Sequence, residues 1–296
     1  MSLVKSVVGR VWTVGSAALQ GFISDNALSR AAAIAFYAAT SLAPVLLIVI
    51  AVAGVVVGRE AAQLAVSLQL TGLLGSQGAE LLTAVVKGAS DNTSGLLAGS
   101  IAVVTLIATA SGVFGEMQAA LNQIWKVDSG TTTLSALVRA RVVSLGLVAA
   151  LGFLLLVSLA ASAAISVLSD FINARFSFGA AILSLIDTVV SLSLLALLFG
   201  GIYRILPDRS LSWRDVRFGA ITTAILFTVG KSLIGLYLGT SAVASSYGAA
   251  GSLIVLLLWV FYSSCTFLFG AEVTRAYAVT TANRRQDADA FVTQPQ

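Results

Sequence analysis

The chain has 296 residues, of which 58% are hydrophobic and 10% are charged, and its formal net charge is +4 at pH 7. Soluble globular proteins carry about 25% charged residues, so this composition cannot cover a water-facing surface and excludes a soluble fold. Histidine, the commonest general base and metal ligand, is absent. Cys265 is the single cysteine, which excludes an intramolecular disulfide.

The first predicted element is an amphipathic helix within residues 1–30. Its apolar residues recur at helical spacing, opposite Lys5, Arg10, Thr13 and Gln20. The apolar set is Leu3, Val4, Val7, Val8, Val11, Trp12, Leu19, Phe22 and Ile23. We expect this segment to anchor the chain in the cytoplasmic membrane interface, with a gate or a partner site as the alternative.

A membrane-spanning helix needs about 20 mostly apolar residues, and six later segments qualify. They are Ala33–Val57, Leu96–Ala120, Val142–Leu168, Phe178–Leu206, Phe218–Gly239 and Gly251–Ala278. The sequence thus predicts an all-α, polytopic integral membrane protein, with a six-helix domain at 31–280 and a polar cytoplasmic tail at 281–296. The long outer loop, 58–95, has apolar periodicity that predicts short helices at Glu60–Leu74 and Gln77–Lys87.

The distribution of Lys and Arg predicts the orientation, since cytoplasmic loops carry the excess of these residues. Of 17 such residues, 13 fall on the side of the termini, three fall on the opposite side, and Lys231 lies within a span. Both termini are therefore expected in the cytoplasm of a bacterial cell. Trp12, Trp125 and Trp213 lie near the inner ends of spans, where they would act as interfacial anchors.

Asp187 and Lys231 lie inside the fourth and fifth spans, which a short connection joins. At ~1.5 Å per residue, Lys231 is about 20 Å from the inner end of its span, and Asp187 is about 14 Å from the outer end. In a ~30 Å hydrocarbon core these depths agree to within a helical turn. We expect the two side chains to face each other, either as a clasp between helices or as part of a substrate pathway.

Other polar residues are predicted at similar depth. Pro44 should bend the first span, and the nearby Thr40 and Ser41 can bond the backbone groups that it frees. The last span contains Tyr262, Ser263, Ser264, Cys265 and Thr266 near its middle. This set resembles the central site of a transporter, but hydroxyls also serve as ordinary contacts between helices, and that interpretation is favoured for them.

Glu116 and Glu272 are expected at the inner boundary of the membrane, about 30 Å from the outer start of their spans. Arg275 follows Glu272 by one turn, so a salt bridge at the interface is the simplest expectation. Neither glutamate is assigned as a proton carrier, because that role would require burial.

Four stretches of the sequence are similar to motifs of a known protein family. They are AAAIAFYAATSLAP (31–44), LNQIW (121–125), LPDRSLSWRDVRFGA (206–220) and YGAAGSLIVLLLWVFYSSCTFLFGAE (247–272). The chain resembles the YihY/BrkB family of bacterial inner-membrane proteins over nearly its whole length. The resemblance implies six helices, a link to envelope integrity and, in some members, serum resistance or export of lipopolysaccharide precursors. It carries no agreed catalytic residues.

The sequence favours a transporter or flippase of a lipid or amphiphile, and a non-transporting envelope scaffold is the alternative. No catalytic residue, metal site, cofactor or nucleotide-binding loop is predicted. The older ribonuclease label of the family is disfavoured, because histidine is absent and the basic residues are explained by topology. The expected partners are membrane lipids, a second copy of the chain or envelope proteins, and not nucleic acid.

Overall fold

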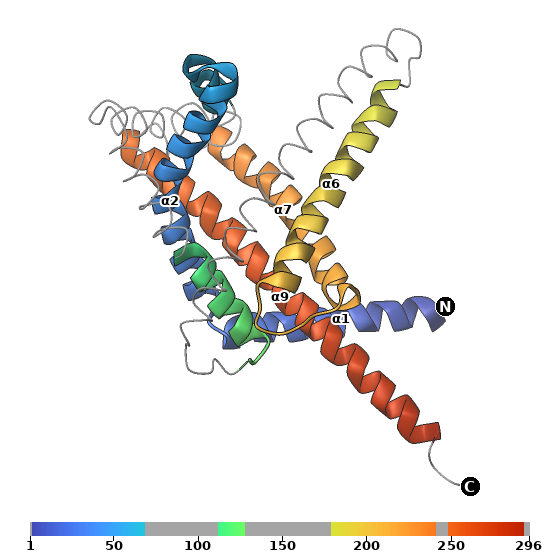
Figure 1. Ribbon diagram of the computed structural model, residues 1–296. Coiled ribbons are helices and arrows are strands. Elements are labelled where there is room, and N and C mark those ends of the chain that lie inside the picture. Colours follow the sequence, from blue (N-terminus) through green and yellow to red (C-terminus); the bar gives the residue numbers. More distant parts are fainter. Residues whose placement is uncertain (1, 69–111, 128–178, 241–247, 293–296) are drawn as a thin grey trace. The chain divides into compact units, whose positions relative to one another are not determined.

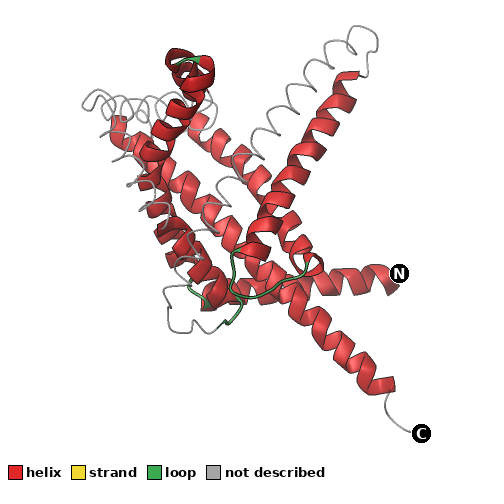
Figure 2. Cartoon of the chain, viewed as in Figure 1, coloured by secondary structure: helices red, strands yellow, loops and turns green. Residues whose placement is uncertain are grey.

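The computed structural model describes residues 2–68, 112–127, 179–240 and 248–292. Figures 1 and 2 show helices joined by short turns, with no strand in these ranges. The all-helical class is therefore confirmed for the described part of the chain. The span expected at 142–168 and the loop helix expected at 77–87 lie outside the described residues.

The described helices cover the segments expected as the first, fifth and sixth spans and all but the two end residues of the fourth, whereas only 112–120 of the segment expected as the second is described. The helices are α1 (Ser2–Ser24), α2 (Ala27–Val57), α6 (Gly179–Ile205), α7 (Trp213–Thr240) and α9 (Gly248–Val292), with further helices at 59–68 and 112–124. Within them, Thr188–Ile205 and Leu256–Ala282 are long and apolar enough to cross a membrane. The arrangement of six spans stays a prediction.

Local sequence explains where several helices begin and end. Asn26 has a φ of 53° and ends α1, and Asn tolerates this left-handed conformation better than most residues. The helix at 112–124 ends in the same way at Lys126, whose φ is 52°, with Val127 N–H donating to Asn122 C=O at 2.9 Å. Lysine is an uncommon choice for this conformation.

The start of α7 is capped by its own side chains. Ser212 precedes the helix, and its hydroxyl and backbone N–H both donate to Asp215 Oδ2, at 2.6 and 3.3 Å. Asp215 thus supplies one half of a capping box, in which a side chain in the first turn accepts from the backbone N–H of the N-cap residue, with aspartate in place of the more usual glutamate. It fixes the point at which the α6–α7 connection becomes helical.

The described residues belong to two compact units. The first comprises residues 1–28, 118–229 and 266–296, and the second comprises 29–117 and 230–265. In the first unit, α6, α7 and α9 contribute the fully buried Tyr203, Thr223 and Leu268. Tyr203 Oη donates to Phe267 C=O at 2.6 Å and lies 2.8 Å from Thr223 Oγ1, so its polar end is satisfied within the core.

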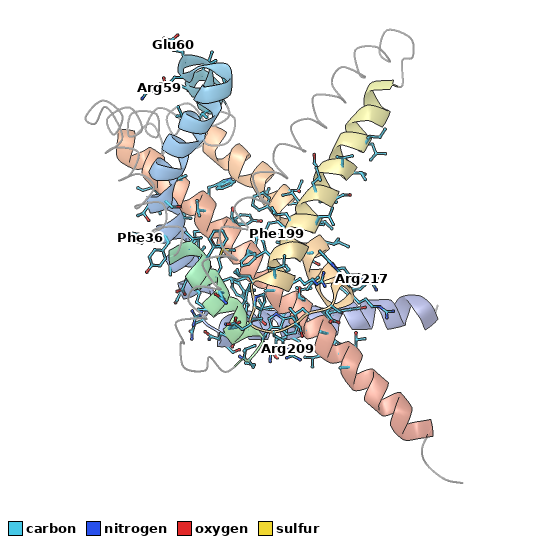
Figure 3. The ribbon with its side chains drawn as sticks, in the orientation of Figure 1. Phe36, Arg59, Glu60, Phe199, Arg209 and Arg217 are labelled. Carbon is cyan, nitrogen blue, oxygen red and sulfur yellow. The ribbon has the colours of Figure 1, made fainter. Side chains whose placement is uncertain are left out.

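Aromatic rings fill the space beside this hydroxyl pair. The Tyr203 and Phe267 rings stack with centroids 5.1 Å apart, and the Phe199 and Phe227 rings lie 5.8 Å apart (Figure 3). In the second unit, the buried apolar residues include Ile34, Leu46 and Leu256. Each unit therefore has an apolar interior of its own.

Candidate functional site

Asp187 lies within α6 and Lys231 lies within α7, so the helices extend through both positions as expected. Their side chains lie outside the described part of the structure, as does the Pro44 ring, although α2 runs through that position. The predicted Asp187–Lys231 pair is therefore still a sequence-based prediction.

The hydroxyls predicted near the middle of the spans bond to their own helices. Thr40 and Ser41 donate to Tyr37 and Ala38 carbonyls at 2.9 and 2.8 Å. Ser263 and Ser264 donate to Trp259 and Val260 carbonyls, each at 2.8 Å. Tyr262 packs so closely on Gly230 that a Cβ there would overlap its ring. These contacts fit the interpretation of the hydroxyls as ordinary helix contacts.

Glu116, in the helix at 112–124, forms an ion pair with Arg30 of α2. The Arg30 Nη1 to Glu116 Oε1 distance is 2.8 Å, and both side chains are partly exposed. Since each charge has a partner and some access to solvent, this pair is a simple connection between two helices of the second unit.

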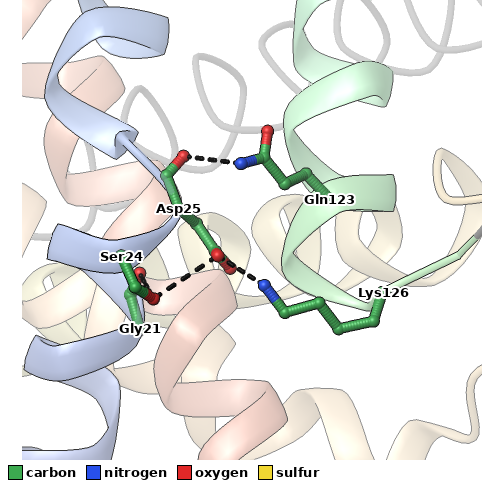
Figure 4. Close-up of polar contacts among 5 residues, drawn as sticks. All are labelled: Gly21, Ser24, Asp25, Gln123 and Lys126. Atoms are coloured by element: carbon green, nitrogen blue, oxygen red, sulfur yellow. Dashed lines mark hydrogen bonds and ion pairs between the residues drawn. The ribbon is translucent and has the colours of Figure 1, made fainter.

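A polar cluster in the first unit surrounds Asp25, in the turn between α1 and α2 (Figure 4). Asp25 is 4% exposed, and its Oδ1 accepts a hydrogen bond from the Lys126 ammonium. Gln123 Nε2 donates to the Asp25 backbone carbonyl at 3.0 Å. The other carboxyl oxygen, Asp25 Oδ2, is buried and meets no hydrogen-bond donor among the described residues.

Glu272 of α9 is 1% exposed, and its carboxyl lies beside Gly21, whose carbonyl accepts a hydrogen bond from Asp25 N–H at 2.9 Å. Its Oε2 lies against Gly21 of α1, where a Cβ would overlap it, and its Oε1 is buried without a donor in the described part. The salt bridge expected with Arg275 is not among the ion pairs of the described residues. The Glu272 side chain instead turns towards α1, where its carboxyl lies against Gly21.

A second polar connection joins the helix at 112–124 to the α6–α7 connection. Asn122 Nδ2 and Gln118 Nε2 donate to the two carboxyl oxygens of Asp208 at 2.6 and 3.0 Å, and Asp208 N–H donates to Asn122 Oδ1 at 2.9 Å. The Arg209 guanidinium lies 5.5 Å from the centre of the Trp125 ring. The motifs LNQIW and LPDRSLSW are thus in direct contact.

Sequence reasoning missed Asp25, Lys126 and Asp208, and it did not find Glu272 to be buried. The available signal was weak: Asp25 sits in the turn Ser24–Asp25–Asn26, where an acidic residue is common for capping reasons alone. Within the described residues, no group of three His, Cys, Asp or Glu side chains could hold a metal ion.

The polarity of the first unit is reversed with respect to a soluble protein. Glu272, Thr223 and Thr274 are buried, whereas a row of large apolar side chains on α7 is exposed. That row comprises Phe218, Ile221, Ile225 and Val229. Only 22% of Thr188–Ile205 is buried, unlike a core helix of a soluble fold. These features define a helical membrane protein.

The model of the family described as virulence factor BrkB matches residues 18–293, and the chain belongs to this family. The resemblance inferred from the four motifs is thereby confirmed.

Curated relatives carry names of the same kind. The chain is 29% identical to a UPF0761 membrane protein of Psychromonas ingrahamii, over 64% of this chain and 61% of that one. It is 32% identical to a UPF0761 membrane protein of Enterobacter sp. strain 638, over 56% and 58%. The chain thus spans about 60% of the length of these relatives.

A protein of Bacillus subtilis named as ribonuclease-like, YfkH, is 32% identical over 36% of this chain and 38% of its own. No solved structure matches the chain.

Proposed function

We propose that this chain is a six-span protein of the bacterial cytoplasmic membrane, with both termini in the cytoplasm, that moves a lipid or amphiphile across the bilayer. Through this activity it would contribute to the integrity of the cell envelope. The observation that carries the proposal is the position of Asp187 and Lys231, which lie inside α6 and α7 rather than at their ends.

Ionised side chains are costly inside a membrane. An ionised side chain at the centre of a spanning helix costs roughly 2.5–3.5 kcal/mol on insertion scales. Both helices expose apolar side chains to their surroundings, among them Leu197 on α6 and Ile225 on α7. An acidic and a basic residue kept in such helices suit a polar path for a head group, provided that they face each other.

The proposed partners are membrane lipids, with a second copy of the chain or an envelope protein as further candidates, and not nucleic acid. No enzymatic activity is proposed. The ribonuclease-like name belongs to the Bacillus subtilis relative, and nothing in this chain, which has no histidine, favours transferring it.

A non-transporting scaffold is the alternative function, and one observation favours it. The hydroxyls of Ser41, Ser263 and Ser264 donate to carbonyls of their own helices. Hydroxyls that are satisfied in this way serve helix packing, so they add little to a binding site for cargo.

The experiment is a lipid-scrambling assay in proteoliposomes containing labelled phospholipids. It compares the wild type with the charge-swapped variant Asp187→Lys/Lys231→Asp. A matched control swaps the exposed charges Arg59 and Glu60 (Figure 3), as Arg59→Glu/Glu60→Arg. We expect lipid movement by the wild type and the control, and its loss in the Asp187/Lys231 swap.

Each other result contradicts part of the proposal. Equal movement by the wild type and the Asp187/Lys231 swap would leave the pair as a clasp between helices, with the pathway elsewhere. The absence of movement in all three folded proteins would contradict lipid transport and favour the scaffold.

A further inference from the structure

The buried carboxyl groups of Asp25 and Glu272 present a hydrogen-bonding problem. Asp25 Oδ2 and Glu272 Oε1 are both buried and both lack a donor among the described residues. A buried carboxylate oxygen without a donor is destabilising, because it has lost its hydration and gained nothing in return. As ionised groups, the two carboxyls therefore leave these oxygens without a donor among the described residues.

The hydrogen-bond donors around Asp25 bond to its other oxygens and not to Oδ2. The Lys126 ammonium donates to Asp25 Oδ1, and the Ser24 hydroxyl lies 3.4 Å from the same oxygen (Figure 4). Gln123 donates to the Asp25 backbone carbonyl. The Asp25 backbone N–H donates to the Gly21 carbonyl at 2.9 Å, and the Glu272 carboxyl lies against the same glycine, so the two buried carboxyl groups border one residue.

We propose that Asp25 and Glu272 share one proton, and that together with Lys126 they form a proton-binding site in the first unit. Two ionised carboxylates only accept hydrogen bonds, so a bond between them requires a proton on one of the two groups. With that proton in place, one carboxyl donates to the other. Lys126 remains on the far oxygen of Asp25 and balances the one negative charge that the pair keeps.

A shared proton would satisfy both buried oxygens at once. A metal ion would need several ligands, and no group of three His, Cys, Asp or Glu side chains in the described part could hold one. Gly21 allows the Glu272 carboxyl to approach α1, because any side chain at that position would overlap Glu272 Oε2.

Lys126, at the end of the helix at 112–124, forms its ion pair with Asp25. Arg275 follows Glu272 by one turn on α9, and it forms no ion pair with Glu272 in the described part. Neither of these basic side chains is therefore paired with the Glu272 carboxyl among the described residues.

This proposal goes beyond lipid movement, since a proton site can exist in a transporter or in a scaffold. Its test is infrared spectroscopy of the full-length protein in lipid nanodiscs at neutral pH. A protonated carboxyl group gives a C=O stretching band that carboxylates lack. The chain contains four glutamates, Glu60, Glu80, Glu116 and Glu272, so labelling glutamate with carboxyl ¹³C identifies a glutamate contribution.

We expect a protonated-carboxyl band in the wild type and its loss in Glu272→Gln, in which the amide replaces the protonated acid as donor to Asp25. Glu116→Gln is the matched control: it removes a carboxylate that is paired with Arg30, so the band should be unchanged. The absence of the band in the wild type, or its persistence unchanged in Glu272→Gln, would overturn the proposal.

A second variant keeps the test decisive if Glu272→Gln fails to fold. Gly21→Ala places a methyl group where Glu272 Oε2 lies, so the carboxyl must move away from its position against α1. We expect the band to shift or to disappear in this variant. A band identical to that of the wild type would show that the proton is held elsewhere.

Discussion

Two glycines, Gly219 of α7 and Gly270 of α9, allow these two helices to pack closely in the first unit. A Cβ at Gly270 would overlap Thr223 Oγ1, and a Cβ at Gly219 would overlap Thr274 Oγ1. The hydroxyls beside these glycines are themselves bonded, Thr223 to Gly219 C=O at 2.7 Å and Thr274 to Gly270 C=O at 2.8 Å. The close approach thus depends on the missing side chains, as in other membrane helix pairs.

We predict that Gly270→Ala separates α7 from α9 and destabilises the protein by about 1–3 kcal/mol, the usual cost of overpacking. The measurement is thermal unfolding in detergent. Gly201→Ala is the control, because a Cβ there meets no atom within 4 Å and alanine favours the helix. Equal unfolding temperatures for wild type and Gly270→Ala would contradict the close contact.

The residues also show what sequence reasoning could not decide. Trp12, Trp125 and Trp213 were expected as interfacial anchors from position alone. Trp12 is 78% exposed, whereas Trp125 is 6% exposed and lies beneath Arg209. Similarly, the local sequence around a glutamate near the end of a span does not reveal whether its side chain is exposed to water or buried in the protein. Burial depends on residues distant in sequence, such as Gly21 beside Glu272.

At the scale of elements, α1 has three sides where the sequence predicted two. At 3.6 residues per turn, Val14, Ala18 and Phe22 share one side. Val14 and Ala18 are buried, and Phe22 is half-buried, with its ring 6.0 Å from that of Phe269. Trp12, Leu19 and Ile23 form a second, exposed apolar side. The polar residues Thr13, Ser16 and Gln20 form the third. A helix with protein, lipid and water around it would show this pattern.

The exposed side of α1 predicts contact with lipid at the level of the head groups. In variants that retain a single tryptophan, we expect lipids brominated near the head group to quench the fluorescence of Trp12 strongly. Trp125 serves as the buried reference and should be quenched weakly. Similar quenching of the two residues would contradict the interfacial position of α1.

The sequence predicted the helices better than their boundaries and contacts. Long apolar runs identified α2, α6, α7 and α9, because both periodicity and length point to a spanning helix. The extension of α9 past Ala278 to Val292 was not foreseen, since that stretch is polar. The contact between Asn122 and Asp208 was also missed: residues 86 positions apart give no local signal.

At the scale of the whole molecule, an even number of spans is needed to place both termini on the same side of the membrane. Arg204, in the last turn of α6, lies 5.0 Å from the centre of the Trp213 ring, and Arg209, in the α6–α7 connection, lies 5.5 Å from the centre of the Trp125 ring. Arginine over tryptophan suits a membrane interface, where both a charged group and an amphipathic ring are stable. This connection should therefore share the cytoplasmic side with both termini.

The most direct test is thiol labelling from each side of the membrane, with single cysteines introduced into a Cys265→Ser background. Ser2→Cys, Ser210→Cys and Thr293→Cys should react only from the cytoplasm, and Ser94→Cys should react only from outside. This result would support an even number of spans with both termini in the cytoplasm, as the six-span arrangement requires. Labelling of positions 2 and 293 from opposite sides would contradict the topology and the proposed site with it.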